Sequence, residues 1–284
     1  MSLETFIPEI WSGELLARLK AALIFGAVAN RDYEADISEF GQVVKINQIG
    51  TITINSYSKN STTLTRQKLN SAQKELKIDQ SKYFDFDIDD IDQAQTKPKV
   101  MQEAMQEAAW GLRNSADQYL ATLYTDAGIV ASLGTEATGI DITSVNVTEY
   151  MQLVSQKMDE NNVPSETRWM IVPPWFHSKL TLAKITLDTN NSDIITNGFK
   201  GNFLGFDVYV SNNVSVKTAS TQQGSRIMAG YRGTMTFAEQ ILKVEGFRPH
   251  DGFEDAVKGL YVFGAKVTRP DTLAVLRADY TVEP

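Results

Sequence analysis

The side chains with the widest chemical range are few in this sequence, and their spacing does not suit catalysis. The chain has 284 residues, with two histidines and no cysteine. His177 and His250 lack the short spacing that zinc ligands or a metalloprotease helix require. His177 falls in an expected helix, where it is either packed or exposed to solvent and needs no chemical role. His250 lies in a Pro-His-Asp-Gly stretch that is typical of a turn. The lack of cysteine removes disulfides, thiolate metal sites and cysteine nucleophiles.

One acidic run has the spacing of half a calcium loop. Asp85, Asp87 and Asp89 alternate as the first ligands of an EF-hand do, but Asp90 stands where that loop needs glycine and Thr96 where it needs glutamate. The phosphate-binding and nucleophile-elbow glycine motifs are missing as well. We therefore predict no catalytic residue, no cofactor and no metal site, and we expect a protein that is not an enzyme.

Composition and charge narrow the class further. The sequence is 42% apolar and 22% charged, as in ordinary globular proteins, and its net charge is −8. No apolar run reaches the roughly 18 residues of a membrane-spanning helix, and the acidic N-terminus does not resemble a signal peptide. A protein that grips phosphates needs a basic surface, so sequence-specific DNA binding is not expected. Enclosing DNA remains compatible with this charge.

The most informative stretch is residues 42–92, where apolar residues alternate with polar ones. After Gly41 they occupy even positions, and the return limb keeps the same phase. The alternation over 76–88 predicts a strand about 40 Å long, and the polar stretch 58–73 predicts a flexible tip between two strands. Such an isolated ribbon is marginally stable in water, so it needs a surface to rest on. The apolar positions are Val44, Ile46, Ile52, Ile54, Leu76, Ile78, Phe84, Phe86 and Ile88.

Charge is segregated along this expected arm. Residues 40–74 contain no Asp or Glu, whereas 75–92 contain seven acids. The basic residues of the first part are Lys45, Lys59, Arg66, Lys68 and Lys74. We hypothesise that the basic tip rests on an acidic part of an adjacent copy, where charge sets register more than affinity. The alternative is that these charged residues are simply exposed to solvent and make no contact with another copy.

A long helix follows the arm. Pro98 is suited to opening a helix over 99–125, about 40 Å long. Its apolar residues follow one face from Met101 to Leu123, and Trp110 lies off that stripe, which indicates a second contact.

The remaining segments predict a compact α/β domain over 127–224 and a return of strands. Asn146 and Glu149 have capping-box spacing before a helix. Strands are expected at 169–172 and 206–210, with a helix at 175–183 between them. In the last sixty residues we predict strands at 226–231, 243–248, 258–267 and 273–276, and a helix at 235–241.

The N-terminal thirty residues predict an extended start and then a short helix. Ser12 is suited to capping that helix, whose apolar stripe runs from Leu15 to Leu23. Phe6 and Trp11 precede it without periodic partners, so they dock either on the chain's own body or on a neighbouring subunit.

This order of elements resembles the Hong Kong 97 fold of tailed-phage major capsid proteins. The resemblance covers nearly the whole chain, and several short stretches also resemble this family in their amino-acid sequence. These are 6–11 (FIPEIW), 30–34 (NRDYE), 41–46 (GQVVKI), 86–94 (FDIDDIDQA), 168–174 (RWMIVPP), 205–212 (GFDVYVSN) and 258–265 (KGLYVFGA). It implies an α+β fold divided into an N-arm (1–41), a long β-hairpin E-loop (42–92), the P-domain spine helix (93–126), an α/β A-domain (127–224) and P-domain return strands (225–284) with a possible A-domain contribution.

The resemblance also implies a function and partners. The chain would self-assemble through hexamers and pentamers into an icosahedral head shell around double-stranded DNA, in the virion after assembly in the host cytoplasm, with no membrane involved. A portal protein and possibly a decoration protein would be partners. A separate scaffolding protein is expected because the sequence begins almost directly at the N-arm. The expected contacts between copies are Phe6, Trp11, Lys59, Arg66, Lys68, Lys74, Asp85, Asp87, Asp89 and Trp110.

Three alternatives remain open at this stage. An encapsulin-like compartment has the same fold but encloses enzymes rather than a genome. A soluble α/β enzyme would be centred on 127–224 and would show turnover as a monomer. A tail-tube subunit would be all-β, which the long helix argues against.

Overall fold

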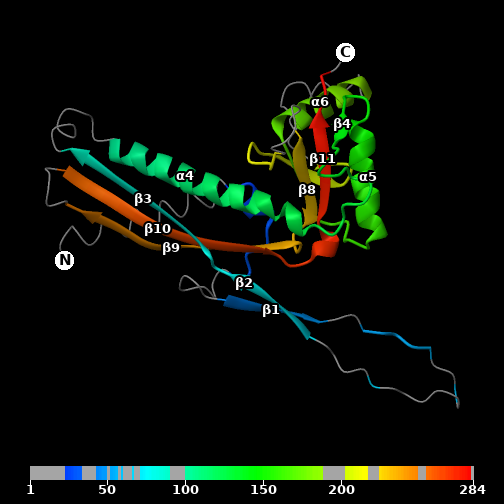
Figure 1. Cartoon of the computed structure of the whole chain (residues 1–284), viewed down its shortest axis with the longest axis horizontal. Helices are drawn as coiled ribbons and strands as arrows, with labels where there is room; N and C mark the ends of the chain where they lie inside the picture. The colour runs from blue at the N-terminus through cyan, green and yellow to red at the C-terminus, as the bar shows by residue number, and fades with distance from the viewer. Residues whose placement is uncertain are drawn as a thin grey trace.

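The computed structural model shows an elongated molecule with three parts: a long helix on a sheet, an α/β domain at one end, and a projecting hairpin (Figure 1). It describes residues 23–33, 43–49, 52–56, 59, 66, 71–89, 100–187, 202–216, 224–248 and 254–282. The C-terminus lies at the top of the α/β domain, away from the hairpin (Figure 1).

The elongated part is a three-stranded antiparallel sheet under the spine helix. The strands β3 (Gln80–Asp89), β10 (Glu254–Val267) and β9 (Met235–Phe247) pair in the order β3-β10-β9. Helix α4 (Val100–Thr122), continued by the 3-10 turn η2 (Leu123–Asp126), runs along one face of this sheet (Figure 1). The predicted long helix over 99–125 is thus confirmed. Its buried stripe packs on aromatic residues of β3 and β10, and this cluster includes Leu112, Ala116, Leu120, Phe84, Phe86, Tyr261 and Phe263.

The α/β domain is built on a six-stranded mixed sheet. Its order is β4 (Ile140–Ile142), β11 (Ala274–Tyr280), β8 (Ser225–Tyr231), β5 (Arg168–Val172), β7 (Phe206–Val210) and β6 (Asn202–Phe203). Helices α5 (Val147–Glu160) and α6 (Pro174–Leu187) pack on one face through a second core. Two central strands, β8 and β11, come from the C-terminal segment 225–284.

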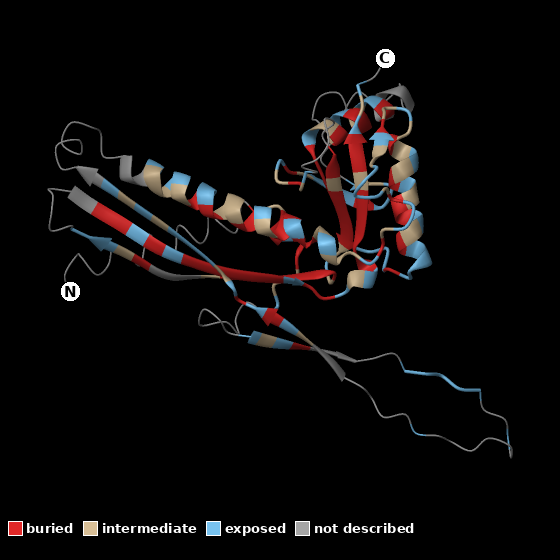
Figure 2. Ribbon diagram, viewed as in Figure 1, coloured by how far each residue is buried: buried red, intermediate tan, exposed pale blue. Residues whose placement is uncertain are grey.

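The two parts share one core. The opposite face of the six-stranded sheet contributes Trp169, Met228 and Val275 to the cluster that lies beneath α4. This alternation explains why β5 is buried at every position: one set of side chains faces the helices and the other faces the spine. The strands at the centre of the domain are accordingly largely red in Figure 2. The α/β domain is therefore packed firmly against the end of the spine region.

The projecting hairpin pairs β1 (Val43–Ile49) with β2 (Ser71–Lys77) in register from Val43↔Lys77 to Ile49↔Ser71. Its base lies on the face of the three-stranded sheet that α4 does not cover. There Ile46, Leu76 and Ile78 form a small core with Ala238 and Val262. Lys74 adds a hydrogen bond from Nζ to the Thr268 carbonyl at 2.6 Å.

The single long strand expected over 76–88 is two strands. β2 ends at Lys77, and after Ile78 and Asp79 the chain joins β10 as β3. The even apolar positions turn inward in both strands, but the buried Leu76 and Ile78 face the hairpin core, whereas the partly buried Phe84 and Phe86 face the spine core. Alternation reports burial and not the partner, so it could not show this change of sheet.

The helix expected over 235–241 is wrong, because these residues begin the 13-residue strand β9. Met235 and Phe237 face the spine core, while Ala238 faces the hairpin core. Burial on both sides erases the period of two that marks a strand, so tertiary packing overrides the local pattern.

The other predicted elements are found close to the expected places, with one difference in detail at α5. The helix begins as expected after Asn146, but the capping box does not form, because that side chain makes no cap bond. Its Oδ1 accepts from the Thr143 N–H at 2.8 Å, and its Nδ2 donates to the Asp141 carbonyl at 2.9 Å. Near the N-terminus the short helix α2 (Phe25–Val28) is described, whereas Ser12 and the stripe from Leu15 to Leu19 lie outside the described residues.

Truncation at the hairpin base tests how firmly this chain holds its own arm. Ile78 is completely buried, so Ile78→Ala should lower the free energy of unfolding of the unassembled protein by about 2–5 kcal/mol. Ile54 is 94% exposed, so Ile54→Ala should change it by less than about 0.5 kcal/mol. Urea unfolding measures both variants, and equal effects would show that the base core is not formed.

Candidate intersubunit surfaces

The distal part of the hairpin arm exposes apolar side chains. Ile52 is 60% exposed and Ile54 is 94% exposed, although both continue the alternation that is buried at Ile46. Lys59 and Arg66, further toward the tip, are exposed as well. The arm thus presents apolar and basic groups together, at a distance from the body of its own chain (Figure 1).

A second surface is the outer face, which we define as the face of β3-β10-β9 opposite α4. One part of it is covered by the hairpin base. The other part is not covered by any element that the structure describes, and it exposes Tyr83 (79%), Phe247 and Leu260. The register places Tyr83 beside Leu260 and Asp85 beside Lys258, and these four residues help to line an open hollow of about 320 Å³.

The outer face is also charged. Asp85 and Asp87 are exposed on β3. Lys258 pairs with Glu245 of β9 at 3.4 Å, and its ammonium lies 4.7 Å from the centre of the Phe247 ring. Two aspartates therefore stand beside a lysine that already has a carboxylate partner, which leaves this surface acidic.

Gly259 is one of the residues that line the hollow. A Cβ atom at this position would lie 2.4 Å from the Phe84 ring, which packs on the spine side of β10. The glycine therefore lets that ring lie directly against the strand on the side that faces α4.

Trp110 marks a third surface, on α4. It is 49% exposed, and Glu107 and Glu103 are exposed about one and two turns before it. This agrees with the prediction that Trp110 lies off the buried stripe.

The other residues predicted at contacts between copies divide into two groups. Phe6, Trp11 and Lys68 lie outside the described residues, as does the side chain of Asp89, whose backbone ends β3. Lys74 is half-buried and bonded to its own chain's Thr268, so its ammonium anchors the base of the arm. The structure thus brings Asp85 and Asp87 together on one face and places Lys59 and Arg66 far from it in the same chain.

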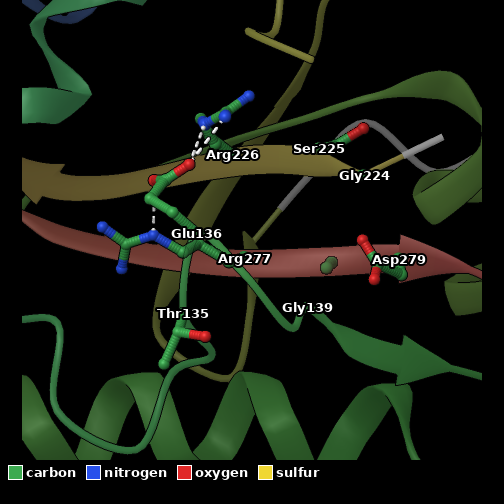
Figure 3. A pocket seen from close by; sticks show the side chains of 9 residues that line it. Thr135, Glu136, Gly139, Gly224, Ser225, Arg226, Arg277 and Asp279 are labelled. Atoms are coloured by element: carbon green, nitrogen blue, oxygen red, sulfur yellow. Dashed lines mark hydrogen bonds and ion pairs between the residues drawn. The ribbon is translucent and has the colours of Figure 1, made fainter. Parts of the chain in front are cut away.

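An ion-pair clamp in the α/β domain involves residues that the sequence did not indicate. Glu136 accepts from Arg226 Nε at 3.0 Å, from Arg226 Nη2 at 2.6 Å and from Arg277 Nε at 2.7 Å (Figure 3). The bonds from Arg226 and then Arg277 lower the pKa of Glu136. Arg226 also lies over the Tyr124 ring at 4.8 Å. The clamp ties the loop before β4 to neighbouring strands β8 and β11.

This clamp leaves no room for a ligand. The space beside it, toward Asp279, measures about 10 Å³, which is enough for about one water molecule. In the part of the chain that the structure describes, no group of three potential metal ligands occurs. His177 is half-buried in α6, and His250 lies outside the described residues. No described helix is long and apolar enough to cross a membrane.

Buried charges beneath α4 were also missed by sequence analysis. Glu239 is 3% exposed and accepts from Arg31 Nη2 at 2.8 Å and from the Tyr261 hydroxyl at 2.5 Å. Burial, and then the Glu239 carboxylate, raise the pKa of Tyr261. Asp117 on α4 is 2% exposed, and burial raises its pKa to about 6. Asp117 and Glu239 each lie among apolar residues in the sequence, and this was the signal that could have indicated a buried acid.

Comparison with known proteins identifies the class. A phage capsid protein family model matches residues 72–278, so the chain belongs to the phage capsid protein family. A search of curated proteins found no match.

Solved capsid structures have the same fold. The chain is similar to a structure from Mycobacterium phage Che8, with 25% identity over 89% of this chain and 90% of that one and a TM-score of 0.73. It also resembles the capsid of cyanophage P-SCSP1u, with 18% identity over 92% and 89% and a TM-score of 0.69. A virus-like particle from Pyrococcus furiosus is similar at 12% identity over 95% and 99%, with a TM-score of 0.54.

These findings confirm the Hong Kong 97 fold and the reading of the chain as a major capsid protein, a structural subunit of the virion. Family and fold together favour the phage capsid over the encapsulin-like compartment.

The Glu136 clamp yields a stability prediction. The side chain is 48% exposed, so solvent weakens its charge-assisted bonds, and Glu136→Gln should cost about 1 kcal/mol at pH 7. The pKa of Glu136 is lowered in the folded protein. Its contribution is therefore present above the ordinary value of 4.5 and is lost as the pH falls below it.

Urea unfolding at pH 7 and at about pH 3.5 measures this difference. Glu166→Gln is the matched control, because Glu166 is exposed and should change stability by less than about 0.5 kcal/mol. A difference between parent and Glu136→Gln that persists undiminished in acid would contradict the clamp.

Proposed function

We propose that this chain assembles through hexamers and pentamers into a closed icosahedral head shell around the phage's double-stranded DNA. The observation that carries this proposal is the arm, whose Ile52 and Ile54 expose 60% and 94% of their surface at a distance from their own chain's core. Exposed apolar surface of this kind marks an interaction site.

The arm's partner, in this proposal, is the outer face of a second copy. The described part of the arm leads away from the three-stranded sheet (Figure 1), so it does not fill the exposed part of its own outer face. The hairpin base already packs on the neighbouring part of the same face through Ile46, Leu76 and Ile78. A second copy's arm would extend this layer and place apolar side chains against Tyr83 and Leu260.

Charge favours the same pairing. Residues 40–74 contain only basic charges, and the outer face presents Asp85 and Asp87. Complementary charges set register and speed encounter, while the apolar contacts supply affinity. Asp89 and Lys68 extend the two charge sets in sequence and are included in the proposal.

Other surfaces serve further contacts between copies. Trp110, with Glu103 and Glu107, forms the third exposed surface, on the spine helix, and Phe6 and Trp11 are large apolar residues of the N-arm. Many individually weak contacts are sufficient in a closed shell, because multivalency multiplies their effect.

The proposal includes the shell's other partners. A portal protein would admit the DNA, a separate scaffolding protein would guide assembly in the host cytoplasm, and a decoration protein is an optional addition. The net charge of −8 suits a container that does not grip phosphates. The subunit would carry no enzymatic activity.

Charge reversal tests the arm contact. The arm variant combines Lys59→Glu, Arg66→Glu and Lys68→Glu, and the face variant combines Asp85→Lys and Asp87→Lys. Each set alone places like charges against each other, so particle yield at low salt should fall at least about tenfold. Combining both sets in one chain restores opposite charges and should recover most of the yield.

Sedimentation of particles across a salt series provides the measurement, since screening above about 0.5 M should reduce the differences. A control reverses three other cations, Lys157, Arg232 and Arg269, and should assemble with the yield of the parent. Normal assembly of the arm variant at every salt concentration, or failure of the combined variant beside a normal control, would overturn the proposed contact.

A further inference from the structure

Residues 23–31 form a short anchor between the N-terminal residues and the body. Leu23, Phe25, Val28 and Ala29 are buried in the spine core. Asn30 then joins the edge of β9, where its N–H donates to the Met235 carbonyl at 2.9 Å and its carbonyl accepts from the Phe237 N–H at 3.0 Å. Whatever position residues 1–22 take, they are tethered to the body through this anchor.

Asp117 on α4 holds the start of the anchor. Its Oδ2 accepts from the Ile24 N–H at 3.2 Å, and the N–H groups of Phe25 and Gly26 also favour the charged carboxylate. The other oxygen, Oδ1, is buried without a hydrogen-bond partner. A buried carboxylate with one unpaired oxygen is costly while it is ionised.

The surrounding charges do not compensate for this cost. Arg113, one turn earlier on α4, favours the charged form only weakly compared with burial. Arg31 is hydrogen-bonded to Glu239 and to the Gly26 carbonyl. Tyr261 of β10 stays neutral because its pKa is raised.

We propose that Asp117 is a proton-operated latch for the anchor, which holds residues 23–31 more tightly when the carboxylate is protonated and loosens them when it is ionised. The two states of the latch differ in the environment of this carboxylate. Docking buries the carboxylate and leaves Oδ1 unpaired, whereas undocking returns it to water.

The direction follows from linkage. Burial raises the pKa of Asp117 from 3.8 to about 6 in the docked state, and in the undocked state water restores the ordinary value. The docked state binds the proton more tightly, so docking gains strength as the pH falls through 6 and is weakest above it. With these two pKa values, docking should be about tenfold more favourable at pH 5 than at pH 8.

Hydrogen exchange of the unassembled full chain tests the latch. The readout is the protection of peptides within 23–31, corrected for the intrinsic exchange rate at each pH. The parent should lose about tenfold protection between pH 5 and pH 8. Asp117→Asn keeps the shape but removes the titration, so its protection should change less than about twofold over this range. Peptides from α5 report global stability in both chains.

The outcomes separate clearly. The latch is overturned if protection of 23–31 in the parent falls no more than that of α5 between pH 5 and pH 8. This test needs only the parent, so it holds even if Asp117→Asn fails to fold. The same pH dependence in parent and Asp117→Asn also overturns it, because a group other than Asp117 would then be responsible. Neither result depends on the shell, so the latch can fail while the proposed assembly stands.

Discussion

The structure depends on one constraint: the arm carries apolar side chains that its own body does not bury. Ile46, Leu76 and Ile78 satisfy the base of the hairpin within the chain, but Ile52 and Ile54 lie beyond reach of that core. Two paired strands without a second layer are marginal in water. The physical consequence is a subunit whose fold is complete in the body and incomplete in the arm, which is suited to association with copies of itself.

The body supplies the rigid surface that such association needs. The sheet β3-β10-β9 is covered by α4 on one face and partly by the hairpin base on the other. The spine core continues into the α/β domain through Trp169, Met228 and Val275. Because one close-packed core joins both parts, the spine region and the α/β domain form a single packed body. The buried network of Arg31, Glu239 and Tyr261 fixes the N-terminal anchor to the same core.

Elements with a regular burial pattern could be predicted from the sequence. The spine stripe, the helices α5 and α6 and the apolar strands β5 and β10 were predicted near their observed places. Segments that serve two cores could not be predicted: residues 235–239 of β9 are buried on both faces, and the change from β2 to β3 keeps the same alternation. For the candidate contacts, the sequence showed the segregation of charge and the position of Trp110 off the buried stripe. Asp85, Asp87 and Trp110 are indeed on exposed surfaces. The contacts of Asp117 and of the Glu136 clamp join residues distant in sequence, and periodicity does not report such partners.

An electron cryo-microscopy reconstruction of the assembled particle tests the central claim most directly. The decisive feature is the environment of Ile52 and Ile54 in the finished shell. Our account predicts both side chains in van der Waals contact with the outer face of a neighbouring copy, near Tyr83 and Leu260. Arms that stand free in solvent, or fold back onto their own chain in the shell, would contradict it.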